Sequence, residues 1–245
     1  MSRLSYVARS ISATLAGVAL VGLGFAQTAQ AQSWPARPVR IIVPFSPGGG
    51  SDLTSRLISQ RLTESLGKQV VVENRPGAAG NIGTEAVARA PADGYTLLLA
   101  TLSTSVNASL FKKLPFDPLT SFDPVSLVVR VPLLLVVHPS VPAQTVQELI
   151  ELARSKPGAL NYASGGTGTA NHVGGELFNA MADVNIALIG YKGGGPALSD
   201  LAGGHVHMMF GTMTSTRDLA KSGRLRAIAT TSAARSPSWP DLPTV

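Results

Sequence analysis

Two glycine-rich segments carry the residue types best suited to chemistry in this chain. The first, FSPGGGSD at 45–52, lies between an apolar run and a segment whose apolar residues recur at helical spacing. Amides in the first turn of a helix have no partners inside the helix, and the aligned peptide dipoles leave about half a positive charge there. Because glycines let an anion approach such amides closely, this segment can bind a carboxylate or a phosphate.

The second segment, ASGGTGTANH at 163–172, repeats the order of strand, glycine loop and helix start. The hydroxyls of Ser164, Thr167 and Thr169 add hydrogen-bond donors, and His172 either donates to an anion or packs locally. Each segment alone also fits an ordinary strand-to-helix turn. Because the two occur in successive halves of the chain, we expect them to hold one carboxylate from both sides.

Cofactor binding and catalysis find less support. The first loop has neither the GK[ST] ending of a Walker loop nor GxGxxG spacing, so we expect no cofactor. A secreted hydrolase using Ser164 is the weaker alternative, because Tyr162 stands where a nucleophile elbow requires glycine. His205 and His207 share one face of a predicted strand without a third metal ligand, and the chain has no cysteine. We predict neither a metal site nor an enzyme.

Alternating strand and helix patterns position both loops. Short apolar runs predict strands at 39–45, 69–73, 95–101, 160–164, 186–191, 206–210 and 225–230. Helical spacing and helix-start signals predict helices at 52–66, 81–90, 146–154, 170–181, 196–202 and 216–222. The first helix should be capped by Ser51 or Asp52 and should end at Gly67.

A less regular stretch separates the two halves. Residues 107–126 hold prolines at 115, 118 and 124, and the apolar run at 125–137 is interpreted as strands that cross between two lobes. The alternation predicts an α/β fold with mostly parallel sheets, in one lobe at 32–125 and a second lobe at 126–245. Ligands of open α/β sheets bind at the carboxyl ends of strands, where these glycines lie.

The N-terminus has the pattern of a signal peptide at 1–31. Arg3 and Arg9 flank the start of an uncharged apolar run at 11–26, and Ala29 and Ala31 fit a signal peptidase site. We expect cleavage after Ala31 and export to the periplasm. No other segment is long and apolar enough to cross a bilayer, and a lipid anchor would need a cysteine.

Composition argues for a small polar ligand. Lys and Arg number 20 and Asp and Glu 14, a net charge of +6, and the basic residues are scattered rather than interleaved with aromatics, so nucleic-acid binding is not expected. Aromatic residues make up only 5% of the chain, which disfavours a sugar site built on stacking platforms.

A series of motifs resembles the receptors of tripartite tricarboxylate transporters, the Bug or TctC-like proteins. They are WPARPVRIIVPFSPGGGSD, VVVENRPGAAGNIG, ADGYTLLLAT, FKKLPFDP, LNYASGGTGTANH, YKGGGPALSDL and PDLPTV. The resemblance implies a two-lobed periplasmic-binding-protein fold of type II. It implies capture of a small carboxylate, such as a di- or tricarboxylate, an acidic amino acid or an aromatic acid. Membrane permease subunits are the implied partners, and we expect a monomer; a ligand sensor for a signalling protein stays an open alternative.

The resemblance also assigns ligand contacts by motif. In the first lobe they are Phe45, Gly48, Gly49, Gly50, Ser51 and Asp52. In the second lobe they are Ser164, Gly165, Gly166, Thr167, Gly168, Thr169 and His172. Thr101 and Ser103, after the third strand, are further candidates.

Two departures from the family pattern are expected to matter. Members often carry Asp where this chain has Gly211, and that change would alter selectivity at the distal end of the ligand. Related proteins continue beyond the position of Val245 with elements that return to the first lobe. We therefore expect the C-terminal part of that lobe to be missing.

Overall fold

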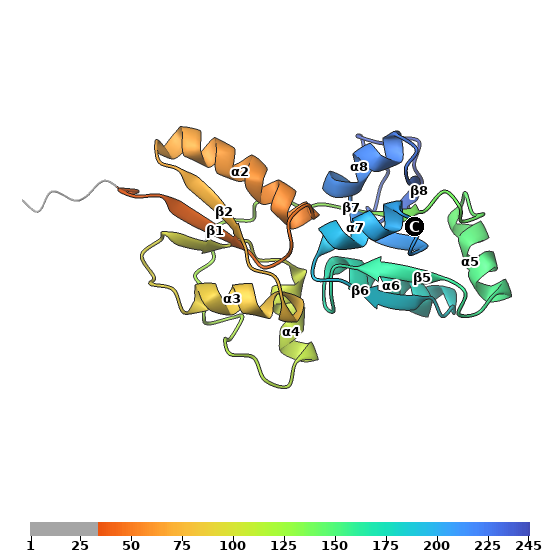
Figure 1. Cartoon of the computed structure of the whole chain (residues 1–245), viewed down its shortest axis with the longest axis horizontal. Coiled ribbons are helices and arrows are strands. Elements are labelled where there is room, and N and C mark those ends of the chain that lie inside the picture. The colour runs from red at the N-terminus through yellow and green to blue at the C-terminus, as the bar shows by residue number, and fades with distance from the viewer. Residues whose placement is uncertain (1–33) are drawn as a thin grey trace, which may run out of the picture. The chain divides into compact units, whose positions relative to one another are not determined.

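The computed structural model describes residues 34–245, so the leader predicted at 1–31 lies outside the described residues. Two sheets carry the helices of the described part (Figure 1). No helix between residues 34 and 245 combines the length and the apolar character needed to span a bilayer.

A three-stranded parallel sheet has β1 (Val39–Val43) at its centre, between β2 (Val70–Asn74) and β3 (Thr96–Leu98). The sequence VRIIV suits this central position, because a strand covered on both faces needs apolar residues along almost its whole length. Val39 and Val43 are nearly inaccessible. The strand predicted at 95–101 is confirmed only as the short β3, whose residues are half-buried.

Helix α2 (Gly50–Leu66) lies on one side of this sheet and α3 (Asn81–Ala88) on the other (Figure 1). A short 3-10 turn, η1 (Ala78–Gly80), precedes α3. The predicted C-terminal stop of α2 is confirmed, because Gly67 adopts a left-handed conformation and its amide donates to Thr63.

The predicted N-cap of α2 is wrong. Gly49 is the cap residue, and the helix begins at Gly50 rather than at Asp52. The Asp52 carboxylate reaches back to the Gly48 amide, one residue before the cap, instead of capping the helix itself. The apolar stripe of α2 is also less buried than its spacing suggests, since Leu57 is 63% exposed.

Helix α4 (Leu102–Leu110) occupies the start of the stretch predicted as irregular at 107–126. Its sequence lacks a clear apolar period, but Thr101 and Thr104 form a capping box that fixes the N-terminus. The strands predicted at 125–137 are reduced to β4 (Leu133–Val137). Val125 lies in the part without strand structure and is 82% exposed, so its apolar character does not reflect burial in a sheet.

The second sheet has five strands in the order β6-β5-β7-β4-β8. Its remaining strands are β5 (Asn161–Ser164), β6 (Ala187–Gly190), β7 (Met208–Thr212) and β8 (Arg226–Thr230). Strand β5 runs parallel to both its neighbours, but β4 is antiparallel to β7 and β8. The prediction of mostly parallel sheets therefore holds for the first sheet and for only part of the second.

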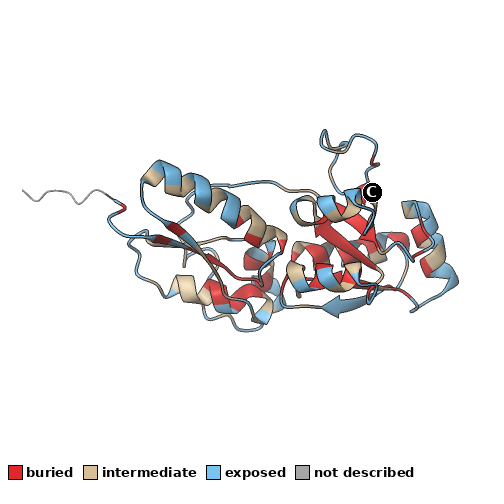
Figure 2. Cartoon of the chain, turned by 45° about the horizontal axis from the view of Figure 1, so that its top comes forward, coloured by how far each residue is buried: buried red, intermediate tan, exposed pale blue. Residues whose placement is uncertain are grey.

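Four helices accompany the second sheet. They are α5 (Val146–Ser155), α6 (Ala170–Ala182), α7 (Gly194–Ala202) and α8 (Met213–Lys221). Successive residues of β4 belong to different buried clusters, with Leu135 in one and Leu134 in the other. Both faces of this strand are therefore covered, whereas the edge strand β6 exposes all its residues (Figure 2).

Helix α6 packs against β5 through a glycine. Tyr162 is completely buried, and its hydroxyl donates to the Glu176 carboxylate at 2.5 Å. Burial and this hydrogen bond raise the pKa of the Tyr162 phenol. A Cβ added to Gly175 would lie 2.3 Å from the Tyr162 ring, so the close approach of helix and strand depends on this glycine.

We predict that Gly175→Ala destabilises the fold by about 1–3 kcal/mol through overpacking, although alanine usually favours a helix interior by about 1 kcal/mol. Gly190→Ala is the matched control, because no atom lies within 4 Å of the added methyl. Urea unfolding of both variants measures the difference. Equal midpoints for Gly175→Ala and the unmodified protein would contradict this packing.

Candidate functional site

The first glycine loop joins β1 to α2 and packs directly against the backbone that joins β6 to α7. Ser46 donates to the Lys192 carbonyl through both its amide, at 3.2 Å, and its hydroxyl, at 3.0 Å. A Cβ added to Gly49 would lie 3.3 Å from the Gly194 backbone. One added to Gly195 would lie 2.1 Å from the Pro47 carbonyl oxygen. Two backbones approach here so closely that side chains would separate them.

The second glycine loop, between β5 and α6, contacts the same backbone. A Cβ added to Gly165 would lie 2.9 Å from the Gly194 amide nitrogen. Gly166 has a φ of +127°, and its added Cβ would lie 3.3 Å from the Tyr191 carbonyl oxygen. The two predicted loops are therefore both in contact with a third glycine loop at 192–195.

Sequence reasoning did not include this third loop among the ligand contacts. Its signal is present in the sequence, because YKGGGP has the same run of three glycines before a helix as the first loop. The start of α8 also lies next to the first loop. A Cβ added to Gly50 would overlap the side chain of Thr212, which is the N-cap residue of α8. The N-termini of α2, α6, α7 and α8 thus gather around the glycine loops.

The charges of these helix starts favour an anion. Helices α6, α7 and α8 have no acidic residue in their first turns, so their free amides and dipoles keep their positive character. The first turn of α2 holds one acid, Asp52.

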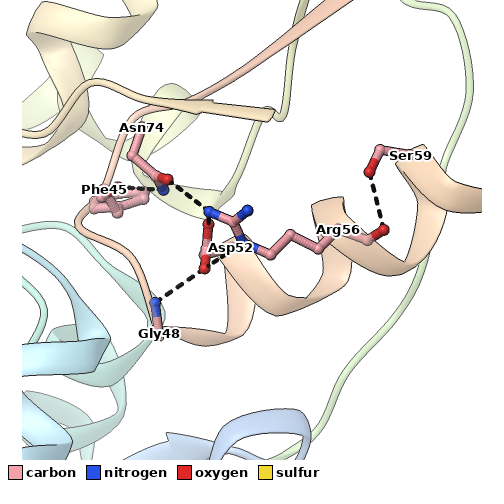
Figure 3. A network of polar contacts seen from close by, with 6 residues as sticks. All are labelled: Phe45, Gly48, Asp52, Arg56, Ser59 and Asn74. Carbon is pink, nitrogen blue, oxygen red and sulfur yellow. Dashed lines mark hydrogen bonds and ion pairs between the residues drawn. The ribbon is translucent and has the colours of Figure 1, made fainter. Parts of the chain in front are cut away.

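Asp52 is neutralised within its own loop (Figure 3). Its carboxylate accepts hydrogen bonds at 3.0 Å from the Gly48 amide and from Nε of Arg56. Arg56 also donates to the Asn74 side chain, which donates in turn to the Phe45 carbonyl. This network ties the end of β1, the glycine loop and the end of β2 together (Figure 3).

The network keeps Asp52 ionised. Burial of the carboxyl opposes ionisation, but hydrogen bonds from Arg56 and Gly48 outweigh that effect and lower the pKa of Asp52. Because the Gly48 amide is already bonded to Asp52, both residues have a structural task in the first loop. Their assignment as ligand contacts stays a prediction.

The polar groups of the second loop mostly bond to one another. The hydroxyls of Ser164 and Thr169 both lie within hydrogen-bond distance of the Gly166 carbonyl, at 3.0 and 2.7 Å. Nδ1 of His172 accepts from the Gly168 amide at 3.3 Å. These contacts shape the loop and leave Thr167 exposed. Ser164 is completely buried, and its hydroxyl bonds to groups of the same loop.

The remaining predicted contacts lie at neighbouring helix starts. Thr101 and Ser103 are joined through their hydroxyls at 2.8 Å, and Ser103 is buried in the first turn of α4. Phe45 is buried, and its ring lies 3.2 Å from a Cβ added to Gly80. Gly211 is buried as well, and an added Cβ would lie 2.2 Å from the Thr216 methyl. An acid at position 211 would require Thr216 to move.

The histidines do not assemble a metal site in the described part. His207 Nδ1 accepts from the Asn161 amide at 3.2 Å, and His138 pairs with Ser140. No group of three or more His, Cys, Asp or Glu residues that could hold a metal ion occurs within residues 34–245.

Comparisons with known proteins agree on one family. Residues 54–245 match the family described as tripartite tricarboxylate transporter family receptor. Protein BugT of Bordetella pertussis is 41% identical over 231 residues, which cover 94% of this chain and 71% of BugT.

Two solved structures are also similar to this chain in both sequence and fold. Rpa4515 of R. palustris, determined with adipate, is 40% identical and has a TM-score of 0.84. The periplasmic binding protein BugD is 40% identical with a TM-score of 0.83. Each comparison covers 86% of this chain and 71% of the other.

We predict that Asp52→Asn lowers the free energy of unfolding at pH 7 by about 1–3 kcal/mol, because it weakens the charged hydrogen bonds to Gly48 and to the half-exposed Arg56. A carboxyl with a lowered folded pKa contributes stability above its unfolded pKa, near the usual 3.8, and loses it as the pH falls through the folded value. The difference between variant and unmodified protein should therefore shrink toward acid pH in urea titrations.

Glu64→Gln is the control for this charge change. Glu64 pairs with Arg61 at 3.3 Å, but both side chains are mostly exposed. Such a surface pair should contribute less than about 1 kcal/mol. Equal losses in the two variants, or a loss in Asp52→Asn that persists unchanged at the lowest pH, would refute a stabilising role for the Asp52 network.

Proposed function

The chain belongs to the tripartite tricarboxylate transporter receptor family, a family of periplasmic solute-binding proteins, and on that premise we propose that it captures a small carboxylate for membrane permease subunits. The ligand carboxylate is held by backbone amides at the glycine loops. The receptor works as a single exported chain after removal of the leader.

The meeting of three glycine loops carries this proposal. Gly49 and Gly165 both lie against Gly194, and helix N-termini follow all three loops. Free amides and helix dipoles at these starts attract a negative group, and the Arg56 partner cancels the charge of Asp52. At these helix starts, backbone N–H groups supply the hydrogen-bond donors that a carboxylate needs, so no charged side chain is required.

We propose that the contacts come from both halves of the chain, in lobes at 32–125 and 126–245. The contacts assigned by motif are kept as candidates, and residues 193–195 are added to them. The addition is supported by the contacts of Gly194, which lies against Gly49 of the first loop and Gly165 of the second.

A dicarboxylate is the first ligand class to test. The related protein Rpa4515 was solved with adipate, a linear dicarboxylate. The scarcity of aromatic residues, at 5% of the chain, also suits a ligand held through polar groups. Backbone amides bind one carboxylate, and the rest of the ligand determines selectivity through other side chains.

We predict saturable binding of at least one acid from a panel of C4–C6 dicarboxylates, acidic amino acids and aromatic acids. The expected dissociation constant is micromolar, about −8 kcal/mol. Isothermal titration calorimetry provides the measurement, with the corresponding amides or methyl esters as controls that lack the negative charge. A folded protein that binds no acid, or that binds esters as tightly as acids, would overturn the proposed function.

We further predict that Gly195→Ala weakens binding of that acid by at least about tenfold, since its methyl group meets the Pro47 carbonyl and moves the loops apart. Gly190→Ala should retain the affinity of the unmodified protein, because the added methyl meets no neighbour. Calorimetry combined with thermal melting separates loss of binding from loss of folding. Unchanged affinity in Gly195→Ala would exclude a role for this backbone contact in binding.

A further inference from the structure

Ser46 makes a polar connection between the half of the chain that holds the first sheet and the half that holds the second. It follows β1, and its partner Lys192 follows β6. Ser46 donates to the Lys192 carbonyl from its amide at 3.2 Å and from its hydroxyl at 3.0 Å. One carbonyl therefore receives two hydrogen bonds from a residue 146 positions away in the sequence.

Glycine at position 193 allows Ser46 to come this close. A Cβ added to Gly193 would lie 2.7 Å from the Ser46 amide nitrogen and 3.1 Å from the Ser46 Cβ. Beside this contact, Gly49 packs against the Gly194 backbone. Hydrogen bonds weaken steeply when donor and acceptor move out of line, so the bonds of Ser46 are lost once the two halves separate.

The covalent connection between the two sheets restrains them weakly. Within residues 34–245 the chain passes from the first sheet to the second once, because β1, β2 and β3 all precede β4 (Figure 1). The passage ends in residues 122–132, which form neither helix nor strand and are exposed from 123 to 130. Since a few irregular residues suffice for a hinge, non-covalent contacts such as that of Ser46 must hold the two halves together.

We propose that Ser46 is a positioning residue for the bound acid, whose hydroxyl holds the two halves together and thereby slows release of the ligand. This inference rests on the proposed function, in which glycine loops from both halves hold the carboxylate. Separation of the loops takes amides away from the carboxylate and also breaks the bonds of Ser46. The hydroxyl acts through the Lys192 carbonyl and needs no contact with the acid.

The expected effect is that of one hydrogen bond. Ser46→Ala removes the hydroxyl and keeps the amide, so one of the two bonds to Lys192 remains. The net contribution of one intramolecular hydrogen bond corresponds to about twofold to tenfold in an equilibrium constant. Ser46 is half-buried, so water replaces part of the lost bond, and we expect the lower part of that range.

A pair of fluorescent labels, one on each half, follows the separation directly. The chain has no cysteine, so Arg61→Cys in α2 and Asp218→Cys in α8 introduce two unique labelling positions. Both side chains are well exposed, at 84% and 89%. Energy transfer between the labels reports the distance between the two halves in the free protein and in the protein with bound acid.

The dissociation rate constant of the acid is the decisive measurement. The probe is whichever of succinate, adipate, glutamate and benzoate binds most tightly, and rapid dilution of the labelled complex in a stopped-flow instrument starts its release. We expect Ser46→Ala to release the acid about twofold to fivefold faster than the labelled protein with Ser46 intact. A folded Ser46→Ala variant with an unchanged dissociation rate constant would overturn the inference.

Ser199→Ala is the matched control. The Ser199 hydroxyl donates to the Gly195 carbonyl at 3.2 Å, and both residues lie in α7. This variant also removes a serine hydroxyl beside the third glycine loop, but its bond does not join the two halves. Its dissociation rate constant should match that of the protein with Ser199 intact. Equal acceleration in Ser199→Ala and Ser46→Ala would contradict a specific role for Ser46.

Failure of this inference is distinguishable from failure of the proposed function. If no acid binds, the proposed function fails, and the label distances of the ligand-free protein decide about Ser46 alone: Ser46→Ala should increase the population with separated labels, and an unchanged distribution overturns the inference. If an acid binds to the protein with Ser46 intact without any change in label distance, the proposed function stands and the inference is wrong. A Ser46→Ala variant that melts at a lower temperature but releases the acid at an unchanged rate assigns Ser46 a structural role only.

Discussion

Direct contact between glycine backbones is the constraint on which the candidate site depends. The carbonyl of Pro47 occupies the position that a side chain at Gly195 would need, and Gly194 lies 3.3 Å from a Cβ added to Gly49 and 2.9 Å from one added to Gly165. Only residues without a Cβ allow the loops from β1, β5 and β6 to meet in this way. The same contact leaves backbone atoms, rather than side chains, as the groups that face one another.

The electrostatics of the site follow from this arrangement. Loops that meet at the carboxyl ends of strands also bring together the helices that follow them, so the positive ends of α2, α6 and α7 lie in one region. Among the first turns of α2, α6 and α7, only that of α2 holds an acidic residue, Asp52. Arg56 neutralises its charge, and the Gly48 amide helps to hold it in place. Positive helix ends, together with an acid that is already paired, favour an anion over a cation in this region.

Much of the fold could be predicted because local sequence determines it. The central strand β1 is apolar along its length, and Gly67 ends α2 in the left-handed conformation that the sequence predicts. Helix α4 was missed because its sequence, LSTSVNASL, has no apolar period, and its capping box is a weaker signal. The run at 125–131 misled the prediction, because apolar residues there lie outside any strand.

Only those parts of the candidate site that carry a glycine motif could be predicted from the sequence. Runs of glycine before a helix identified the first two loops, and the third, at 193–195, has the same signal. That Gly194 lies against both of the other loops is a property of tertiary packing, which one sequence does not reveal.

A crystal structure of the protein with its bound acid tests the central claim most directly. The account predicts that carboxylate oxygens of the ligand lie about 2.7–3.1 Å from backbone amides in the segments 48–52, 165–169 or 193–195, with donors from more than one segment. A carboxylate paired instead with lysine or arginine side chains, at a distance from all three glycine loops, would contradict it.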